Sequence, residues 1–223
     1  MMVVGRYRAV LFDWRGTLVH YPELAWWVER AFRAVDRPIE RAAIDAVVTR
    51  LEAAWALPEI EEASRTEDSS AELNRSALML WCERAGLDDR LAESLYRLDF
   101  DPENHPMYPD VPGVLASLRA LGVKTALVSD IHFDLRAYFA AHDIEALIDA
   151  YILSFELGYQ KPDSRMFEVA LKKLDVEPRE ALMVGDRASH DGAAASVGID
   201  TLILPMPKEF GPRGLDVVTR LVE

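Results

Sequence analysis

A short apolar run that ends in a carboxylate constrains this chain more than any other stretch. Ala9–Phe12 is apolar at every position, Asp13 follows it, and a Gly16-Thr17 turn comes next. The run is too short for a helix and is apolar on both faces, so it predicts a buried central strand of a parallel sheet. Such a strand would place Asp13 at the carboxyl edge, where α/β folds bind ligands. Taken alone, Asp13 could equally be a turn residue or a helix N-cap.

Residues 20–105 differ from the rest of the chain because they carry no strand pattern. Apolar residues recur at helical spacing over 22–36 and 38–57. Further helices are expected over 71–85, capped by Ser69 or Ser70, and from about 88 to 98. Residues 59–70 are polar and acidic and are predicted to form a loop. We therefore expect an all-helical insert over 20–105, within a core formed by 1–19 and 106–223.

Beyond the insert, strand patterns alternate with helix patterns, which is typical of parallel βαβ units. The expected fold is an α/β, Rossmann-like parallel sheet that an all-helical cap domain interrupts after the first strand. The strands are predicted at 123–128, 151–154, 181–184 and 201–204, and the helices at 112–121, 133–141, 162–174 and 189–197.

Composition narrows the partners and the compartment. Half of the 223 residues are hydrophobic, which suffices for a sizeable core, and the formal net charge is -13. This negative charge argues against nucleic acid or an anionic membrane as the main partner. The single cysteine, Cys82, excludes an intrachain disulfide, and no apolar run approaches the ~20 residues that span a bilayer. No signal segment precedes the first strand, so a cytoplasmic protein is expected, either a monomer or a homodimer.

Polar residues end three of the predicted strands, at Asp13, Ser129 and Asp186. Parallel strands bring their carboxyl ends to one edge, where a site can form from separate strands. Ser129 and Asp130 could equally cap the following helix. Asp186 and Asp191 share one loop-to-helix turn, and three carboxylates together repel one another unless a cation lies among them. Oxygen ligands of this kind suit Mg²⁺.

In these motifs, in their order and spacing, the chain resembles the haloacid dehalogenase-like (HAD) hydrolases. The resemblance implies that Asp13 is the nucleophile that forms an aspartyl-phosphate, which splits phosphoryl transfer into two steps. It implies that Asp13, Asp186 and the main-chain carbonyl of Arg15 bind Mg²⁺, with support from Asp191. Lys161 would offset the charge of the phosphoryl group. The residues that would bind the phosphate or substrate are Trp14, Thr17, Ser129, Asp130 and Lys161.

The chain departs from the family pattern at Arg15. Phosphatases of this family usually carry an Asp at this position, which protonates the leaving oxygen and then activates water. Arginine stays protonated and cannot take a proton, although it could pair with Asp13 or donate two hydrogen bonds to the phosphate. General acid–base help is typically worth ~10²–10⁴-fold, so its loss should be costly for an alkyl phosphate. The imidazoles that could supply proton transfer are those of His20, His132 and His190.

Two other branches of the family also lack that Asp. The 2-haloacid dehalogenases use the same nucleophile without a metal, and they lack the acidic ligand that Asp186 provides here. The phosphonoacetaldehyde hydrolases form a Schiff base on a cap lysine, whereas the first lysine here is Lys124, beyond the insert. The sequence therefore favours a Mg²⁺-dependent phosphohydrolase acting on a small phosphorylated metabolite. The alternatives are a catalytically weakened phosphate-ester binding or regulatory protein and a metal-free dehalogenase-type hydrolase.

Adjacent tryptophans stand in the first helix of the insert. Trp26 and Trp27 cannot share one helix face, so at least one must point away from the core of the insert.

Overall fold

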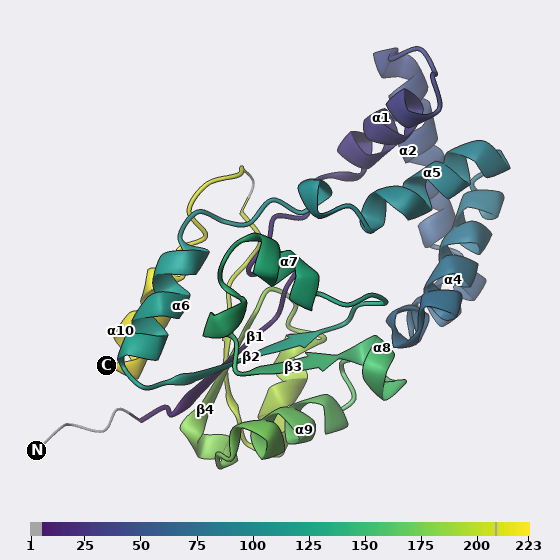
Figure 1. The fold of residues 1–223 in the computed structure, drawn as a ribbon. Helices are drawn as coiled ribbons and strands as arrows, with labels where there is room; N and C mark the ends of the chain where they lie inside the picture. The colour runs from purple at the N-terminus through teal and green to yellow at the C-terminus, as the bar shows by residue number, and fades with distance from the viewer. Residues whose placement is uncertain (1–5, 208) are drawn as a thin grey trace, which may run out of the picture.

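A parallel sheet forms the centre of the protein, as predicted (Figure 1). The computed structural model describes residues 6–207 and 209–223. Within them, five strands lie in the order β3-β2-β1-β4-β5, so that β1 is central. All four pairings are parallel, and β1 lies between β2 and β4. The strands are β1 (Ala9–Phe12), β2 (Lys124–Ser129), β3 (Ala150–Leu153), β4 (Ala181–Gly185) and β5 (Asp200–Ile203).

Helices cover both faces of the sheet because alternate side chains of a strand point to opposite faces. Val10 and Phe12 pack with the helices α6, α7 and α10, whereas Ala9 and Leu11 pack with α9 and the 3₁₀ helix η5. The bounds of these helices are α6 (Val111–Ala120), α7 (Arg136–Ala141), α9 (Arg165–Leu174), η5 (Asp191–Val197) and α10 (Asp216–Val222). Shorter turns are η3 (Glu145–Leu147), α8 (Ser154–Leu157) and η4 (Pro178–Glu180).

Between β1 and β2 the chain forms a group of helices that lies to one side of the sheet (Figure 1). These helices, which we call the helical insert, have an apolar cluster of their own. No helix in residues 6–207 and 209–223 is long and apolar enough to cross a membrane. The elements are α1 (Leu24–Ala34), α2 (Arg41–Trp55), α3 (Pro58–Ser64), η1 (Glu67–Ser69), α4 (Ala71–Arg84), α5 (Asp89–Asp99) and η2 (Pro102–Asn104).

The prediction of a loop over 59–70 was wrong, because this segment contains α3 and η1. Pro58 occupies the first turn of α3, where its missing N–H costs nothing, and acidic Glu59 and Glu61 favour the positive end of the helix. Ile60 is buried and anchors the helix. The N-cap of the next helix was predicted correctly, since the Ser70 side chain accepts a hydrogen bond of 3.1 Å from the Leu73 N–H.

Three other differences are local. The helix expected from 162 begins at Arg165. The helix expected over 189–197 is a 3₁₀ helix from Asp191, and α10 was not predicted.

Candidate active site

Three carboxylates meet at the carboxyl edge of the sheet. Asp13 follows β1, Asp186 follows β4 and Asp191 begins η5. One carboxylate oxygen from each lies within 4.8 Å of the others. The structure therefore brings together three of the residues that the sequence singled out.

Lys161 lies among these carboxylates with its ammonium group fully buried. Its Nζ donates to Asp13 Oδ1 at 2.7 Å and to Asp191 Oδ1 at 2.6 Å. Burial alone would lower the pKa of Lys161, but Asp13, Asp130 and Asp191 raise it. Burial likewise opposes ionisation of Asp191, yet Lys161 lowers the pKa of this carboxyl. Lys161 is therefore a permanent positive charge beside the nucleophile candidate.

Asp13 and Asp186 carry negative charge that Lys161 does not fully offset. Burial raises the pKa of Asp13. Burial and, next, the negative charge of Asp13 raise the pKa of Asp186 to about 6. Asp186 Oδ1 is buried and has no hydrogen-bond partner among the described residues. A divalent cation would supply the missing partner, and an oxygen-only donor set of this kind fits Mg²⁺.

Glycine makes this close approach of the carboxylates possible. Gly16 has a φ of +76°, and a Cβ there would lie 2.4 Å from Asp186 Oδ2. A Cβ on Gly185 would lie 2.2 Å from Asp191 Oδ2. A side chain at either position would displace a carboxylate of the cluster.

The remaining predicted phosphate-binding residues surround this cluster. Thr17 Oγ1 donates to Asp13 Oδ2 at 3.3 Å, and Ser129 is buried at the end of β2. Asp130 Oδ1 accepts from the backbone N–H of Lys161 at 2.7 Å and so positions the lysine. The Trp14 side chain is fully buried against His105 and Tyr138, so only its backbone could face a phosphate.

Arg15 neither pairs with Asp13 nor lies free. Its Nη2 bonds Asp99 Oδ1, on the last residue of α5, at 2.5 Å. Of the two possibilities that the sequence left open for Arg15, pairing with Asp13 does not occur in the structure. Sequence reasoning missed Asp99 because this ion pair joins residues 84 positions apart. Arg15 thus links the β1 loop to the helical insert.

His132 extends this link to a second carboxylate of the insert. Its Nε2 lies 3.2 Å from Asp99 Oδ2, and its Nδ1 lies 3.1 Å from Asp68 Oδ1. The backbone N–H of Asp68 in turn donates to Gln160 Oε1 at 2.9 Å. Sequence reasoning missed Asp68 as well, since it lay in the segment taken as a loop.

The hydrogen-bonding partners of the other two imidazoles lie outside the carboxylate cluster. His20 Nδ1 lies 3.4 Å from the Tyr108 hydroxyl, and burial lowers the pKa of His20. Burial and Arg187 lower the pKa of His190 to about 4, and its Nδ1 lies 2.9 Å from Ser189 Oγ.

Arg187 is a further site residue that sequence reasoning missed. Its Nη2 donates to Asp130 Oδ2 at 3.2 Å, on the residue that positions Lys161. The sequence could have indicated Arg187, because it directly follows Asp186 and a cation beside several carboxylates usually pairs with one of them.

Trp26 and Trp27 separate as the helix geometry requires. Trp27 is buried, and its Nε1 donates to the Pro22 carbonyl at 3.1 Å. Trp26 is partly exposed under the Arg30 guanidinium, whose carbon lies 4.7 Å from the ring centroid.

A family model for haloacid dehalogenase-like hydrolases matches residues 7–198, which include the whole carboxylate cluster. The chain belongs to this family. The fold and the hydrolase class that the sequence predicted are thereby confirmed.

Known proteins of two activities resemble this HAD hydrolase. (S)-2-haloacid dehalogenase 1 from Pseudomonas sp. (strain CBS-3) is 31% identical over 137 residues, 59% of this chain and 57% of that protein. Phosphoserine phosphatase from Thermus thermophilus is 31% identical over 140 residues, 58% of this chain and 55% of that protein. The matches thus span little more than half of either relative.

The fold has a solved counterpart over its full length. The magnesium-bound HAD-hydrolase YfnB from Bacillus subtilis superimposes with a TM-score of 0.73 at 18% identity, covering 97% of this chain and 99% of that one. At this identity the likeness establishes the fold.

Proposed function

We propose that this HAD hydrolase is a Mg²⁺-dependent phosphohydrolase that acts on a small phosphorylated metabolite through an aspartyl-phosphate on Asp13. The observation that carries the proposal is the cluster of Asp13, Asp186 and Asp191, in which Asp186 Oδ1 is buried without a partner. A metal-free dehalogenase would have no use for the Asp186 carboxylate. Its presence therefore favours the phosphatases over the dehalogenases among the relatives.

The proposed roles follow from the contacts of each side chain. Mg²⁺, held by Asp13, Asp186 and the main-chain carbonyl of Arg15 with support from Asp191, would supply positive charge at the transferring phosphoryl group. Asp13 attacks phosphorus, the bond from phosphorus to the ester oxygen breaks, and the alcohol leaves with a proton taken from solvent. Water then attacks the aspartyl-phosphate, which releases inorganic phosphate and restores the Asp13 carboxylate. Hydrogen bonds from Lys161 and Thr17 to the Asp13 carboxylate hold it in one orientation for the attack. The helical insert would act as the cap that encloses the organic part of the substrate.

The test is Mg²⁺-dependent release of p-nitrophenol from p-nitrophenyl phosphate. We expect turnover by the unchanged protein, loss of turnover on addition of EDTA, and loss in Asp13→Asn and Asp186→Asn. Asp216→Asn, which removes an exposed carboxylate from α10, is the matched control and should retain full activity. Halide release from a 2-haloacid in the presence of EDTA, without phosphatase activity, would instead show a dehalogenase.

A second candidate function is supported by Arg15 alone. Position 15, two residues after Asp13, is an arginine and not an acid–base carboxylate, and its guanidinium bonds Asp99. A protein of this kind could bind phosphate esters and hydrolyse them slowly, as a regulatory protein would. Tight binding of a phosphate ester to the unchanged protein, with no product released over many hours, would favour this candidate.

A further inference from the structure

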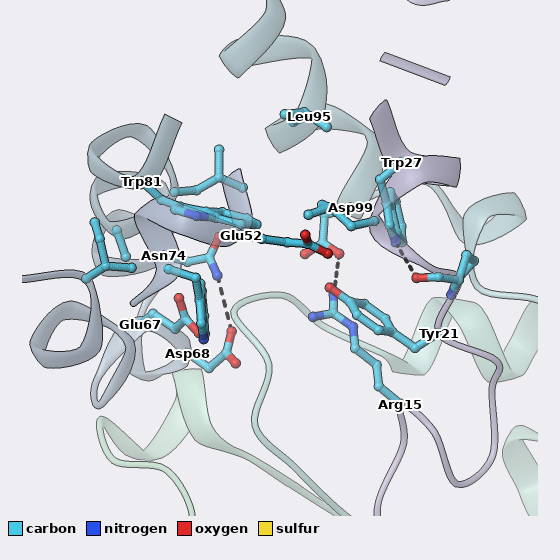
Figure 2. Close-up of a pocket in the computed structure, with 16 residues that line it drawn as sticks. Arg15, Tyr21, Trp27, Glu52, Glu67, Asp68, Asn74, Trp81, Leu95 and Asp99 are labelled. Carbon is cyan, nitrogen blue, oxygen red and sulfur yellow. Dashed lines mark hydrogen bonds and ion pairs between the residues drawn. The ribbon is translucent and has the colours of Figure 1, made fainter. Parts of the chain in front are cut away.

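A cavity lies between the helical insert and the loop that follows β1 (Figure 2). Its volume is about 440 Å³, within the range of small-molecule sites. Arg15, two residues after Asp13, lines it together with Tyr21, and helices of the insert complete the wall. Through Arg15 the cavity reaches the loop that carries Asp13.

The wall is rich in aromatic rings, and the indole N–H groups of two of them already have partners. Tyr21, Trp27, Trp55 and Trp81 line the cavity. Trp27 Nε1 donates to the Pro22 carbonyl, and Trp81 Nε1 donates to the Leu51 carbonyl at 2.8 Å. Trp55 packs against Trp81 with ring centroids 5.2 Å apart. These rings thus offer a ligand apolar and π surface, which suits an apolar stem or a cation.

The polar atoms of the cavity are mostly acceptors. Asn74 is buried, and its Oδ1 has no partner among the described residues, while its Nδ2 donates to Asp68 Oδ1 at 3.2 Å. Glu52 and Glu67 also line the cavity, and within residues 6–207 and 209–223 neither side chain forms an ion pair or hydrogen bond. Arg15 is the only cation that lines the cavity within the described residues; its Nη2 bonds Asp99, and its buried Nε has no partner there. The other donors of the lining include the Tyr21 hydroxyl and Asn74 Nδ2, of which Nδ2 already bonds Asp68.

We propose that this cavity selects phosphate esters whose organic part carries a protonated amine on an apolar stem. The ammonium N–H groups would donate to Glu52, Glu67 and Asn74 Oδ1, and the stem would pack on the tryptophan rings. An anionic group in the same place would meet Glu52, Asp68 and Asp99 with only one guanidinium in compensation. This substrate class deepens the proposed phosphohydrolase function and rests on it.

The electrostatics of Glu67 agree with this assignment. Burial and, next, Asp68 raise the pKa of Glu67 to about 8, against the attraction of Arg15 and Arg187. Glu67 is therefore mostly protonated in the free protein at neutral pH. An ammonium group beside it would favour the carboxylate, so binding of a cationic ester should release a proton.

Three aryl phosphates with the same two-carbon linker and nearly equal leaving groups form the test set: the phosphate esters of tyramine, para-propylphenol and para-hydroxyphenylpropionic acid. They differ in carrying an ammonium, a methyl or a carboxylate group at the end of that linker. We expect kcat/KM for the tyramine ester to exceed that for the propylphenol ester by about tenfold or more, with the carboxylate ester slowest. Glu52→Gln and Glu67→Gln should reduce this preference. Glu62→Gln, an exposed carboxylate outside the cavity, should leave it unchanged.

Two readouts separate this inference from the proposed function. If p-nitrophenyl phosphate and all three esters are hydrolysed with no preference for the amine, the inference is overturned and the proposed function stands. If no ester is hydrolysed, the proposed function fails. Titration calorimetry of the three esters with Asp13→Asn then decides the inference separately: tighter binding of the tyramine ester supports it, and equal or weaker binding overturns it.

Discussion

Asp13, Lys161 and Asp191 form a connected set of buried contacts in the site. One ammonium group bonds two carboxylates, and all three side chains are buried or nearly so. Removing one partner of a buried ion pair leaves an uncompensated charge, which is far more costly than losing an exposed pair. This residue-scale arrangement gives the first prediction.

Lys161→Met should unfold at a lower temperature and lose most of its phosphatase activity. We expect a loss of about 3–5 kcal/mol in unfolding free energy and about a hundredfold or more in kcat. The destabilisation should be greatest near pH 8 and smaller near pH 5, where the stranded carboxylates take up protons. Lys172→Met, which changes an exposed lysine of α9, should behave like the unchanged protein in both assays. Equal stability and activity of the two variants would contradict the role given to Lys161.

Glu67 offers a pH-dependent prediction. Its pKa of about 8 in the folded protein lies above the ordinary value of 4.5, so folding takes up a proton at pH values between the two. Stability from this group is full below pH 4.5 and falls as the pH rises through about 8. Glu67→Gln removes this penalty, so its melting temperature relative to the unchanged protein should rise from pH 5 to pH 8. Each kcal/mol should shift it by about 2–4 °C in a chain of this size. A difference that does not change with pH would contradict the burial of the Glu67 carboxyl.

The sequence could locate the site residues that stand at the end of a strand or directly after it. Asp13, Ser129 and Asp186 lie at one edge because consecutive parallel strands must end there. The partner of Arg15 could not be located, because Asp99 lies on a helix whose docking depends on tertiary packing. An apolar periodicity shows which face of a helix is buried but not which loop meets its end.

At the scale of elements, the end of α5 and the turn η1 attach the helical insert to the core. Asp99 bonds Arg15 and faces His132, and Asp68 faces His132 and bonds Gln160. The short 3₁₀ element that carries Asp68 escaped prediction because it has too few residues to show a period. Asp68 matters because its contacts with His132 and Gln160 join segments that are far apart in the chain.

A charge exchange tests the attachment at α5. Arg15→Asp places a carboxylate against Asp99 and should lower the melting temperature. Adding Asp99→Arg restores opposite charges and should recover part of this loss, with a coupling energy of about 1 kcal/mol or more. Arg33→Asp, at an exposed i,i+4 pair in α1, is the matched control and should change stability by about 0.5 kcal/mol or less. Additive effects of the two site substitutions would contradict a direct link between the β1 loop and α5.

For the whole molecule, the order of elements explains why the fold was predictable. Helix patterns without strands over 20–105, followed by alternating strands and helices, allow few arrangements other than a parallel sheet with a helical insert. The position of the insert over the sheet edge was not predictable in the same way. It depends on contacts such as that of Arg15 with Asp99, two residues that also line the aromatic and acidic cavity.

The most direct test of the central claim is to trap the covalent intermediate. The protein would be mixed with p-nitrophenyl phosphate and Mg²⁺, quenched in acid within the first turnover, digested, and its peptides weighed by mass spectrometry. We predict a phosphoryl group on the peptide that contains Asp13, dependent on Mg²⁺ and missing from Asp13→Asn. Rapid hydrolysis of the ester with no phosphoryl group on that peptide at any time point would contradict nucleophilic attack by Asp13.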